Sequence, residues 1–114
     1  MNDYRDLIVW QKSMDLTVLV YELTKDFPSD EKYGIVSQMR RASVSVPSNI
    51  AEGSRRRGRD QRHLYLIAFG SASELETQIE VSKRLSLGKA EVLVTVESLC
   101  LEVLKMLNKM TLEP

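Results

Sequence analysis

Apolar residues recur at steps of three and four along most of the chain, which is the spacing of an α-helix rather than of a strand. The pair Phe27-Pro28 interrupts the first such run, because proline cannot continue a hydrogen-bonded helix. The pattern predicts a first helix over about residues 7–26. Its apolar stripe is expected at Leu7, Trp10, Met14, Val18, Tyr21 and the stem of Lys25.

A second helix is predicted over residues 29–55, with Ser29 as its N-cap. The stripe expected for this helix contains Ile35, Met39, Ala42, Val46, Ile50 and Ala51. Pro47 lies within the range, where a proline removes a backbone hydrogen bond and costs about 3 kcal/mol. We expect a kink there unless neighbouring residues compensate, and the alternative is two shorter helices that meet near residues 45–48.

Two further helices are predicted, over residues 59–86 and 89–110, after a turn between Gly53 and Gly58. The third has its stripe at Leu64, Ile67, Ser71, Leu75, Ile79 and Ser82, and the fourth at Val92, Val96, Leu99, Val103, Met106, Leu107 and Met110. Four helices of about 20 residues with short connections predict an all-α, antiparallel up-down-up-down four-helix bundle. A five-piece helical array, broken at Pro47, is the alternative.

Length and composition favour one domain over residues 1–114, since 43% hydrophobic residues can bury a core without metals or disulfides. Cys100 lies in an apolar stretch and is interpreted as a small buried hydrophobe. No secretory signal is visible, and no apolar run approaches the ~20 residues of a membrane span. We therefore expect a cytoplasmic protein with no membrane role.

Sixteen basic and sixteen acidic residues give no net charge, but their distribution is uneven. Seven of the nine arginines lie in residues 40–62, where Glu52 and Asp60 are the only acids, so this segment carries +5 and the rest −5. Arginine binds phosphate through planar, bidentate donors. The candidate nucleic-acid-binding residues are Arg40, Arg55, Arg56, Arg57, Arg59 and Arg62.

Other interpretations of this arginine cluster stay open. It is equally typical of a solvated turn, and glutamates of a neighbouring subunit can neutralise it. The aromatic residues near it in the sequence are Tyr65 and Phe69, both at positions that suit the core. Sequence-specific reading of single strands is therefore not favoured.

If the second and third helices form a hairpin about residues 57–58, polar residues face each other across it. The expected polar seam comprises Gln38, Arg41, Ser45, Asn49, Glu52, Gly70, Glu74 and Thr77. The hairpin register pairs Gln38 with Thr77, Arg41 with Glu74, Ser45 with Gly70, and Glu52 with His63. Gly70 is expected to allow close approach to the small residues 43–45. The seam is interpreted as a hydrogen-bond network that fixes register, and the alternative is a ligand pocket.

The motifs of the common enzyme classes are missing from the sequence. There is one histidine, His63, with no glutamate three residues before it, which argues against a di-metal carboxylate bundle. Neither a phosphate-binding Gly-x-x-x-x-Gly-Lys loop nor a nucleophile elbow occurs. We therefore expect no catalytic residues, no metal and no cofactor.

Several stretches resemble a known bacterial family. They are Val9-Trp10-Gln11-Lys12, Phe27-Pro28, Gln38-Met39-Arg40-Arg41-Ala42, Ser45-Val46-Pro47-Ser48-Asn49-Ile50-Ala51-Glu52-Gly53, Gly70-Ser71 and Glu74-Leu75-Glu76-Thr77. Together they resemble the four-helix-bundle proteins encoded in intervening sequences of large-subunit ribosomal RNA genes. A related branch is the accessory variability determinant of diversity-generating retroelements, a pentameric basic barrel that binds nucleic acid and its reverse transcriptase. The zero net charge of this chain departs from that basic branch.

The resemblance implies a four-helix protomer with Pro47 accommodated in its second helix, assembly into a homopentamer, and no enzyme activity. With the arginine cluster, it leads us to expect a homo-oligomer that contacts RNA or DNA phosphates. The alternative is an oligomeric scaffold for a protein partner, with Ile8, Val20 or Leu101 on its docking surface.

Overall fold

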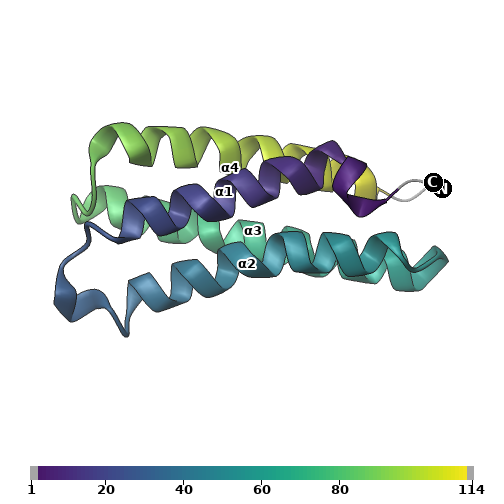
Figure 1. Ribbon diagram of the computed structural model, residues 1–114, viewed down its shortest axis with the longest axis horizontal. Helices are drawn as coiled ribbons and strands as arrows, with labels where there is room; N and C mark the ends of the chain where they lie inside the picture. The colour runs from purple at the N-terminus through teal and green to yellow at the C-terminus, as the bar shows by residue number, and fades with distance from the viewer. Residues whose placement is uncertain (1–2, 113–114) are drawn as a thin grey trace.

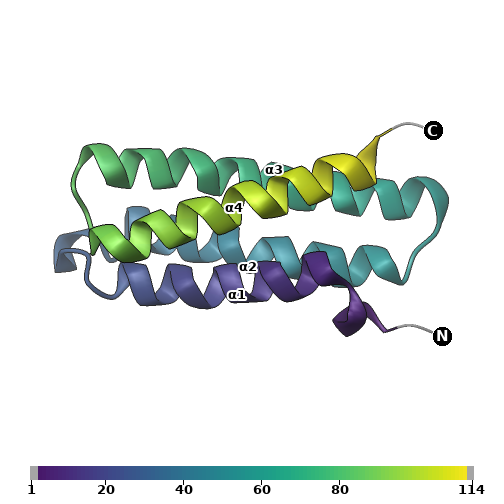
Figure 2. The same cartoon turned by 90° about the horizontal axis from the view of Figure 1, so that it is seen from above.

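The computed structural model describes residues 3–112, and within this range it consists of four α-helices and two short 3-10 turns. In chain order the elements are η1 (Tyr4–Asp6), α1 (Ile8–Thr24), η2 (Ser29–Glu31), α2 (Ile35–Ser54), α3 (Gly58–Arg84) and α4 (Ala90–Thr111). The all-α bundle expected from the sequence is confirmed. Consecutive helices run in opposite directions, and each lies against its two neighbours around the bundle (Figures 1 and 2).

This arrangement defines two ends of the molecule. The α2–α3 turn, the η1 turn before α1 and the last turn of α4 lie at one end (Figure 1). The connections from α1 to α2 and from α3 to α4 lie at the other. No helix within residues 3–112 is long and apolar enough to cross a membrane.

Pro47 lies inside α2, which runs unbroken from Ile35 to Ser54, so the five-piece array is wrong. A proline has no amide proton, and the carbonyl of Ser43, four residues earlier, loses its usual donor. The hydroxyl of Thr17, on α1, lies 2.9 Å from this carbonyl and 2.9 Å from that of Ser13. The neighbouring helix therefore provides the donor that Pro47 lacks.

The two carbonyls that follow Ser43 also receive side-chain donors. Ser48 Oγ donates to the carbonyl of Val44 at 2.8 Å, and Asn49 Nδ2 donates to the carbonyl of Ser45 at 2.8 Å. Side-chain bonds of this kind, to the carbonyl four residues earlier, often accompany a bend in a helix.

The core lies along the bundle axis, but the stripe predicted for α1 was wrong. Met14, Val18 and Tyr21 are 38%, 62% and 43% exposed. The buried residues of α1 are Val9, Ser13, Leu16, Val20, Leu23 and Thr24. Two apolar stripes share this helix, and periodicity does not say which one faces the core. Because Val20 is fully buried, it cannot belong to a docking surface.

The other helices match their predicted stripes to different degrees. In α4, Val96, Val103 and Leu107 are fully buried, and Cys100 is buried as expected. In the first half of α3 the predicted Ile67 is exposed. The buried residues of α3 up to its middle are Tyr65, Ala68 and Ala72.

The start of the second helix differs from the prediction. Ser29 begins the 3-10 turn η2, and its side chain caps no helix. The chain turns again at Gly34 before α2 begins at Ile35. The prediction that Ser29 is the N-cap of the second helix is therefore wrong, since the N-cap position of α2 is Gly34.

Candidate nucleic-acid interface

The turn between α2 and α3 contains only three residues, Arg55, Arg56 and Arg57, all exposed. The backbone amides of Arg55 and Arg56 donate to the carbonyls of Glu52 and Gly53, at 3.1 and 3.0 Å. The positive φ of Gly58, +56°, lets α3 start directly after the turn. The arginines therefore project from a fixed backbone.

Close packing of the two helices holds this turn in place. A Cβ added to Gly53 would lie 2.7 Å from the ring of Tyr65, so only glycine fits there. Gln61 Nε2 also donates to the carbonyls of Gly53 and Arg56, at 3.1 and 3.0 Å. Gly70 was expected to allow close approach to residues 43–45, and that expectation is wrong, because no atom of a neighbouring element lies within 4 Å of a Cβ built there.

At the end of the bundle that carries the α2–α3 turn, the charges of two arginines are not paired within the described residues. Within the described residues, the guanidinium groups of Arg57 and Arg59 make no hydrogen bond or ion pair, and both side chains are exposed. Arg56 lies 3.7 Å from Glu52, in a surface pair whose side chains are about half exposed. Such a pair contributes only about 0–1 kcal/mol, so it is easily exchanged for another anion.

The remaining arginines have structural contacts. Arg62 Nε donates to the carbonyl of Thr111 at 2.9 Å, in the last turn of α4. Arg40 donates to Thr24 Oγ1 at 2.9 Å and covers the ring of Tyr21 at 4.5 Å. Because Arg40 lies about four helical turns from the α2–α3 turn, it is not part of this arginine cluster.

An aromatic residue that sequence reasoning missed lies beside the turn. The Tyr4 ring has the guanidinium carbons of Arg5 and Arg55 at 4.6 and 5.2 Å from its centroid. It also meets Trp10 edge to face, with the centroids 5.1 Å apart. No spacing in the sequence relates Tyr4 to Arg55, since η1 reaches α2 only through the tertiary fold. Tyr65, in contrast, is buried.

Asp3 belongs to the same end of the molecule. A hydrogen bond from the backbone amide of Arg5 holds the pKa of Asp3 below its ordinary value, and the guanidinium groups of Arg5 and Arg55 lower it further. Asp3 is therefore a charged carboxylate beside the arginines at neutral pH.

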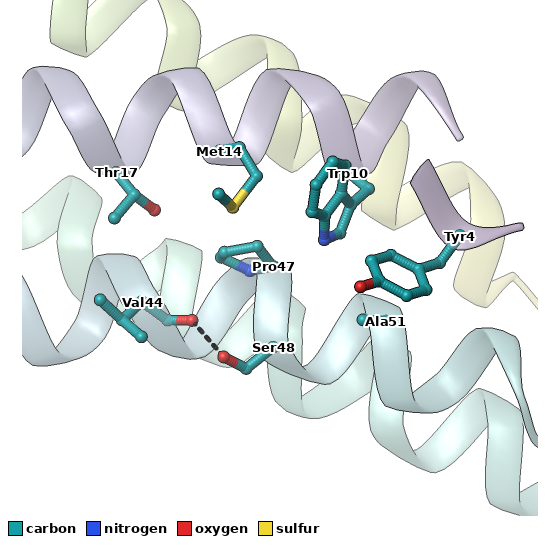
Figure 3. Close-up of a pocket in the computed structure, with 8 residues that line it drawn as sticks. All are labelled: Tyr4, Trp10, Met14, Thr17, Val44, Pro47, Ser48 and Ala51. Atoms are coloured by element: carbon teal, nitrogen blue, oxygen red, sulfur yellow. Dashed lines mark hydrogen bonds between the residues drawn. The ribbon is translucent and has the colours of Figure 1, made fainter. Parts of the chain in front are cut away.

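Two adjacent hollows open beside Tyr4. One, of about 320 Å³, lies between α1 and α2 and is lined by Tyr4, Trp10, Met14, Thr17, Val44, Pro47, Ser48 and Ala51 (Figure 3). The other, of about 470 Å³, is lined by Tyr4, Ser48, Ala51, Glu52, Arg55 and Arg56. The first is mostly apolar and the second carries two guanidinium groups.

The polar seam between α2 and α3 is exposed at Arg41 and Glu74 and half-buried at Ser45 and Asn49. Arg41 pairs with Glu74 at 3.4 Å, with the side chains 70% and 44% exposed. Ser45 Oγ lies 2.8 Å from Ser71 Oγ, so Ser71 is its partner and not Gly70. Asn49 Nδ2 reaches Ser45 Oγ at 3.1 Å, within its own helix.

The ends of the seam differ in their contacts. Gln38 and Thr77 line one hollow of about 530 Å³, together with Glu74 and Gln78. Glu52 pairs with Arg56 within α2 and its turn, and not with His63. The structure thus places Gln38, Arg41, Ser45, Glu74 and Thr77 along the facing sides of α2 and α3, and Glu52 beside the arginine turn.

Within residues 3–112, no group of three His, Cys, Asp or Glu side chains is arranged to hold a metal ion. Burial raises the pKa of the Cys100 thiol to about 12, so it stays protonated at neutral pH.

Comparisons with known proteins agree on the fold. Residues 5–109 match the sequence profile of the family described as 23S rRNA-intervening sequence protein. A solved structure from Bacteroides thetaiotaomicron, described as a protein of unknown function from the S23 ribosomal protein family, superposes with a TM-score of 0.81. It is 22% identical and covers 93% of this chain and 100% of its own. None of the curated proteins matches this chain.

Proposed function

The chain belongs to the 23S rRNA-intervening sequence protein family, and we propose that it is a non-enzymatic homo-oligomer that contacts nucleic-acid phosphates through its α2–α3 turn. Affinity comes from electrostatic contacts between arginine side chains and the phosphate backbone of RNA or DNA. In this proposal the site binds nucleic acid and catalyses no reaction.

One observation carries the proposal. Five of the eight residues 55–62, at one end of the bundle, are arginines, and two of them, Arg57 and Arg59, have exposed guanidinium groups without a protein partner in the described chain. A cation that the fold leaves unpaired is free to displace the counterions around a phosphate. The short turn and the start of α3 fix the backbone positions of these two arginines, so only their side chains are ordered on binding, at about 0.5–1.5 kcal/mol each.

Assembly of several copies would strengthen this effect. A closed symmetric oligomer repeats each arginine once per subunit, so a modest charge per chain becomes a large local field. Exposed apolar residues on every helix support assembly, including Ile8, Val18, Val94 and Leu101, which are 59%, 62%, 65% and 44% exposed. A homopentamer is the form that we expect.

The proposal is tested by measuring affinity for structured RNA and duplex DNA by fluorescence anisotropy at several salt concentrations. Binding that weakens steeply with salt is expected. In the variant Arg57→Gln/Arg59→Gln, the slope of log affinity against log salt should fall by about one per arginine lost at each contact site.

The matched control is Lys32→Gln/Arg84→Gln, which removes two exposed cations from the opposite end of the bundle. It should leave affinity and salt slope unchanged. If wild type shows no affinity at low salt, or if both double variants lose affinity equally, the α2–α3 turn is not a phosphate-binding site.

A protein-binding scaffold is the second candidate, favoured by the exposed apolar residues of α4. Val94 and Leu101 lie seven residues apart on one face of that helix. A partner of this kind would bind the wild type and Arg57→Gln/Arg59→Gln equally, since these arginines lie at the end of the bundle and not on its side.

A further inference from the structure

The two hollows beside Tyr4 form one composite site. They share Tyr4, Ser48 and Ala51 as lining residues, so they adjoin each other. In the first, Trp10 and Met14 on α1 face Pro47 on α2, with Tyr4 at the end nearest the turn (Figure 3). Flat apolar surfaces therefore lie directly beside the two guanidinium groups of the second hollow.

The short η1 turn that carries Tyr4 is held by its own hydrogen bonds. Asp3 Oδ1 accepts from the amide of Arg5 at 2.9 Å, and Asp6 Oδ2 accepts from the amide of Asp3 at 3.2 Å. Gln11, on α1, donates through Nε2 to the carbonyl of Arg5 at 2.8 Å. Because this turn also contacts α2, the Tyr4 ring has a fixed place beside the arginines.

Among the charged side chains around the second hollow, one cation has no carboxylate partner in the described residues and can bind an anionic ligand. The two nearby carboxylates have partners: Asp3 pairs with Arg5 at 3.1 Å and Glu52 with Arg56 at 3.7 Å. Within the described residues, no carboxylate lies within ion-pair distance of Arg55, whose guanidinium instead lies over Tyr4. An arginine over an aromatic ring keeps N–H donors at its edge that can bind phosphate.

A ligand with a flat apolar part joined to an anion fits both hollows at once. We propose that the site binds an unpaired nucleotide of a single-stranded nucleic acid, its base against Trp10 and Tyr4 in the first hollow and its phosphate at Arg55 and Arg56. This rests on the proposed function and gives it a substrate preference. Arg57 and Arg59 follow along the turn and contact the adjacent phosphates.

A duplex does not offer such a ligand. Its bases are stacked and paired, so protein side chains reach unstacked bases only in loops, bulges and single strands. Duplexes therefore bind through the arginines alone, and single strands gain the additional contact with Trp10 and Tyr4. Stacking of this kind tolerates any base, so little sequence preference is expected.

Trp10 provides a direct measurement, because it is the single tryptophan of the chain. Labelled single-stranded RNA and a duplex of the same sequence are titrated at low salt, with RNA anisotropy and tryptophan emission followed together. Single-stranded RNA should quench the emission as it binds, and the duplex should bind without quenching.

A pair of tyrosine variants gives a second measurement. Tyr4→Leu should weaken single-strand binding by about tenfold and duplex binding much less, because the duplex loses only the support that the ring gives to Arg55. The matched control is Tyr33→Leu, since Tyr33 is 88% exposed and lies beyond η2 at the other end of the bundle. It should change neither affinity.

Three results would overturn the inference in different ways. Binding of both nucleic acids with no change in emission, and no effect of Tyr4→Leu, would remove the nucleotide site and leave the arginine turn intact. Absence of binding to either would refute the proposed function as well. A change of emission on dilution of the protein alone, with none on addition of RNA, would show that a second copy of the chain covers the hollow.

Discussion

Gly53 and Gly70 lie in facing helices but have opposite surroundings. A Cβ at Gly53 would collide with the buried ring of Tyr65, whereas a Cβ at Gly70 would meet no atom within 4 Å. At Gly53 the absent side chain lets α2 and α3 approach each other beside the arginine turn. At Gly70 the glycine only weakens its helix.

The two alanine substitutions should therefore have opposite signs. Gly53→Ala should lower the free energy of unfolding by about 1–3 kcal/mol through overpacking. Gly70→Ala should raise it by up to about 1 kcal/mol, because alanine favours the helix. Urea denaturation measures both, and loss of stability in Gly70→Ala would show that its surface is covered.

Cys100 should make stability depend on pH in the alkaline range. Burial raises the thiol pKa to about 12, with smaller contributions from the charges of Glu76 and Glu97, whereas the unfolded chain ionises near the ordinary value of 9.0. Above that pH the unfolded state binds fewer protons than the folded state. The contribution of the thiol to the free energy of unfolding is therefore complete below pH 9.0 and is lost as pH rises toward 12.

The measurement compares wild type with Cys100→Ala by urea denaturation from pH 8 to pH 10. The difference in unfolding free energy between them should shrink by at most about 1.4 kcal/mol per pH unit above the ordinary thiol pKa. A difference independent of pH would mean that the thiol is accessible in the folded protein.

At the scale of the helix, α2 passes through a proline because α1 compensates for it. Thr17 lies 2.9 Å from the Ser43 carbonyl, which has no amide donor at position 47. The Thr17 hydroxyl has one proton, and both the Ser13 carbonyl in its own helix and the Ser43 carbonyl in α2 can accept it. Its contact with Ser43 links α1 to α2. The backbone of α2 at Pro47 therefore depends on the contact with α1 as well as on the proline.

A double-mutant cycle tests this link. Thr17→Val should cost about 1–2 kcal/mol in the wild type, since it leaves the part-buried Ser43 carbonyl unsatisfied. In Pro47→Ala the alanine amide takes over as donor, so the same change should cost much less. Equal costs in the two backgrounds would show that Thr17 does not compensate for the proline.

The α1 helix also shows why apolar periodicity can mislead. It has one apolar stripe that includes Leu16 and Val20 and another that includes Met14 and Val18, about half a turn away. Both stripes have the spacing of three and four residues that predicts the buried face of a helix. The first is buried in the core between α2 and α4, whereas the second is 38% exposed at Met14, at the hollow between α1 and α2, and 62% exposed at Val18.

At the scale of the whole molecule, charge and exposed apolar surface suit an assembled protein. The +5 of residues 40–62 lies on α2 and the start of α3, while the remaining residues sum to −5. Copies related by rotation can place acidic residues of one subunit against the arginine-rich end of the next. The exposed apolar residues provide the burial that stabilises such a contact.

We expect the protein to sediment well above its chain mass of 13.0 kDa at micromolar concentration. Leu101→Lys should shift it toward the monomer, since a charge cannot be buried without a partner. Thr95→Lys, also exposed on α4, gives the comparison for an added charge alone. Sedimentation of the wild type as a monomer at all concentrations would contradict the assembly.

The sequence by itself determined the helical class, the approximate ends of α3 and α4, the pairing of Arg41 with Glu74, and the concentration of arginines in one turn. These depend on short-range rules: helical periodicity, chain breakers and hairpin register. Only the tertiary structure decided which stripe of α1 is buried, that Gly53 and not Gly70 permits close packing, and that Tyr4 lies beside Arg55. Those outcomes depend on contacts between residues distant in sequence, which local spacing does not encode.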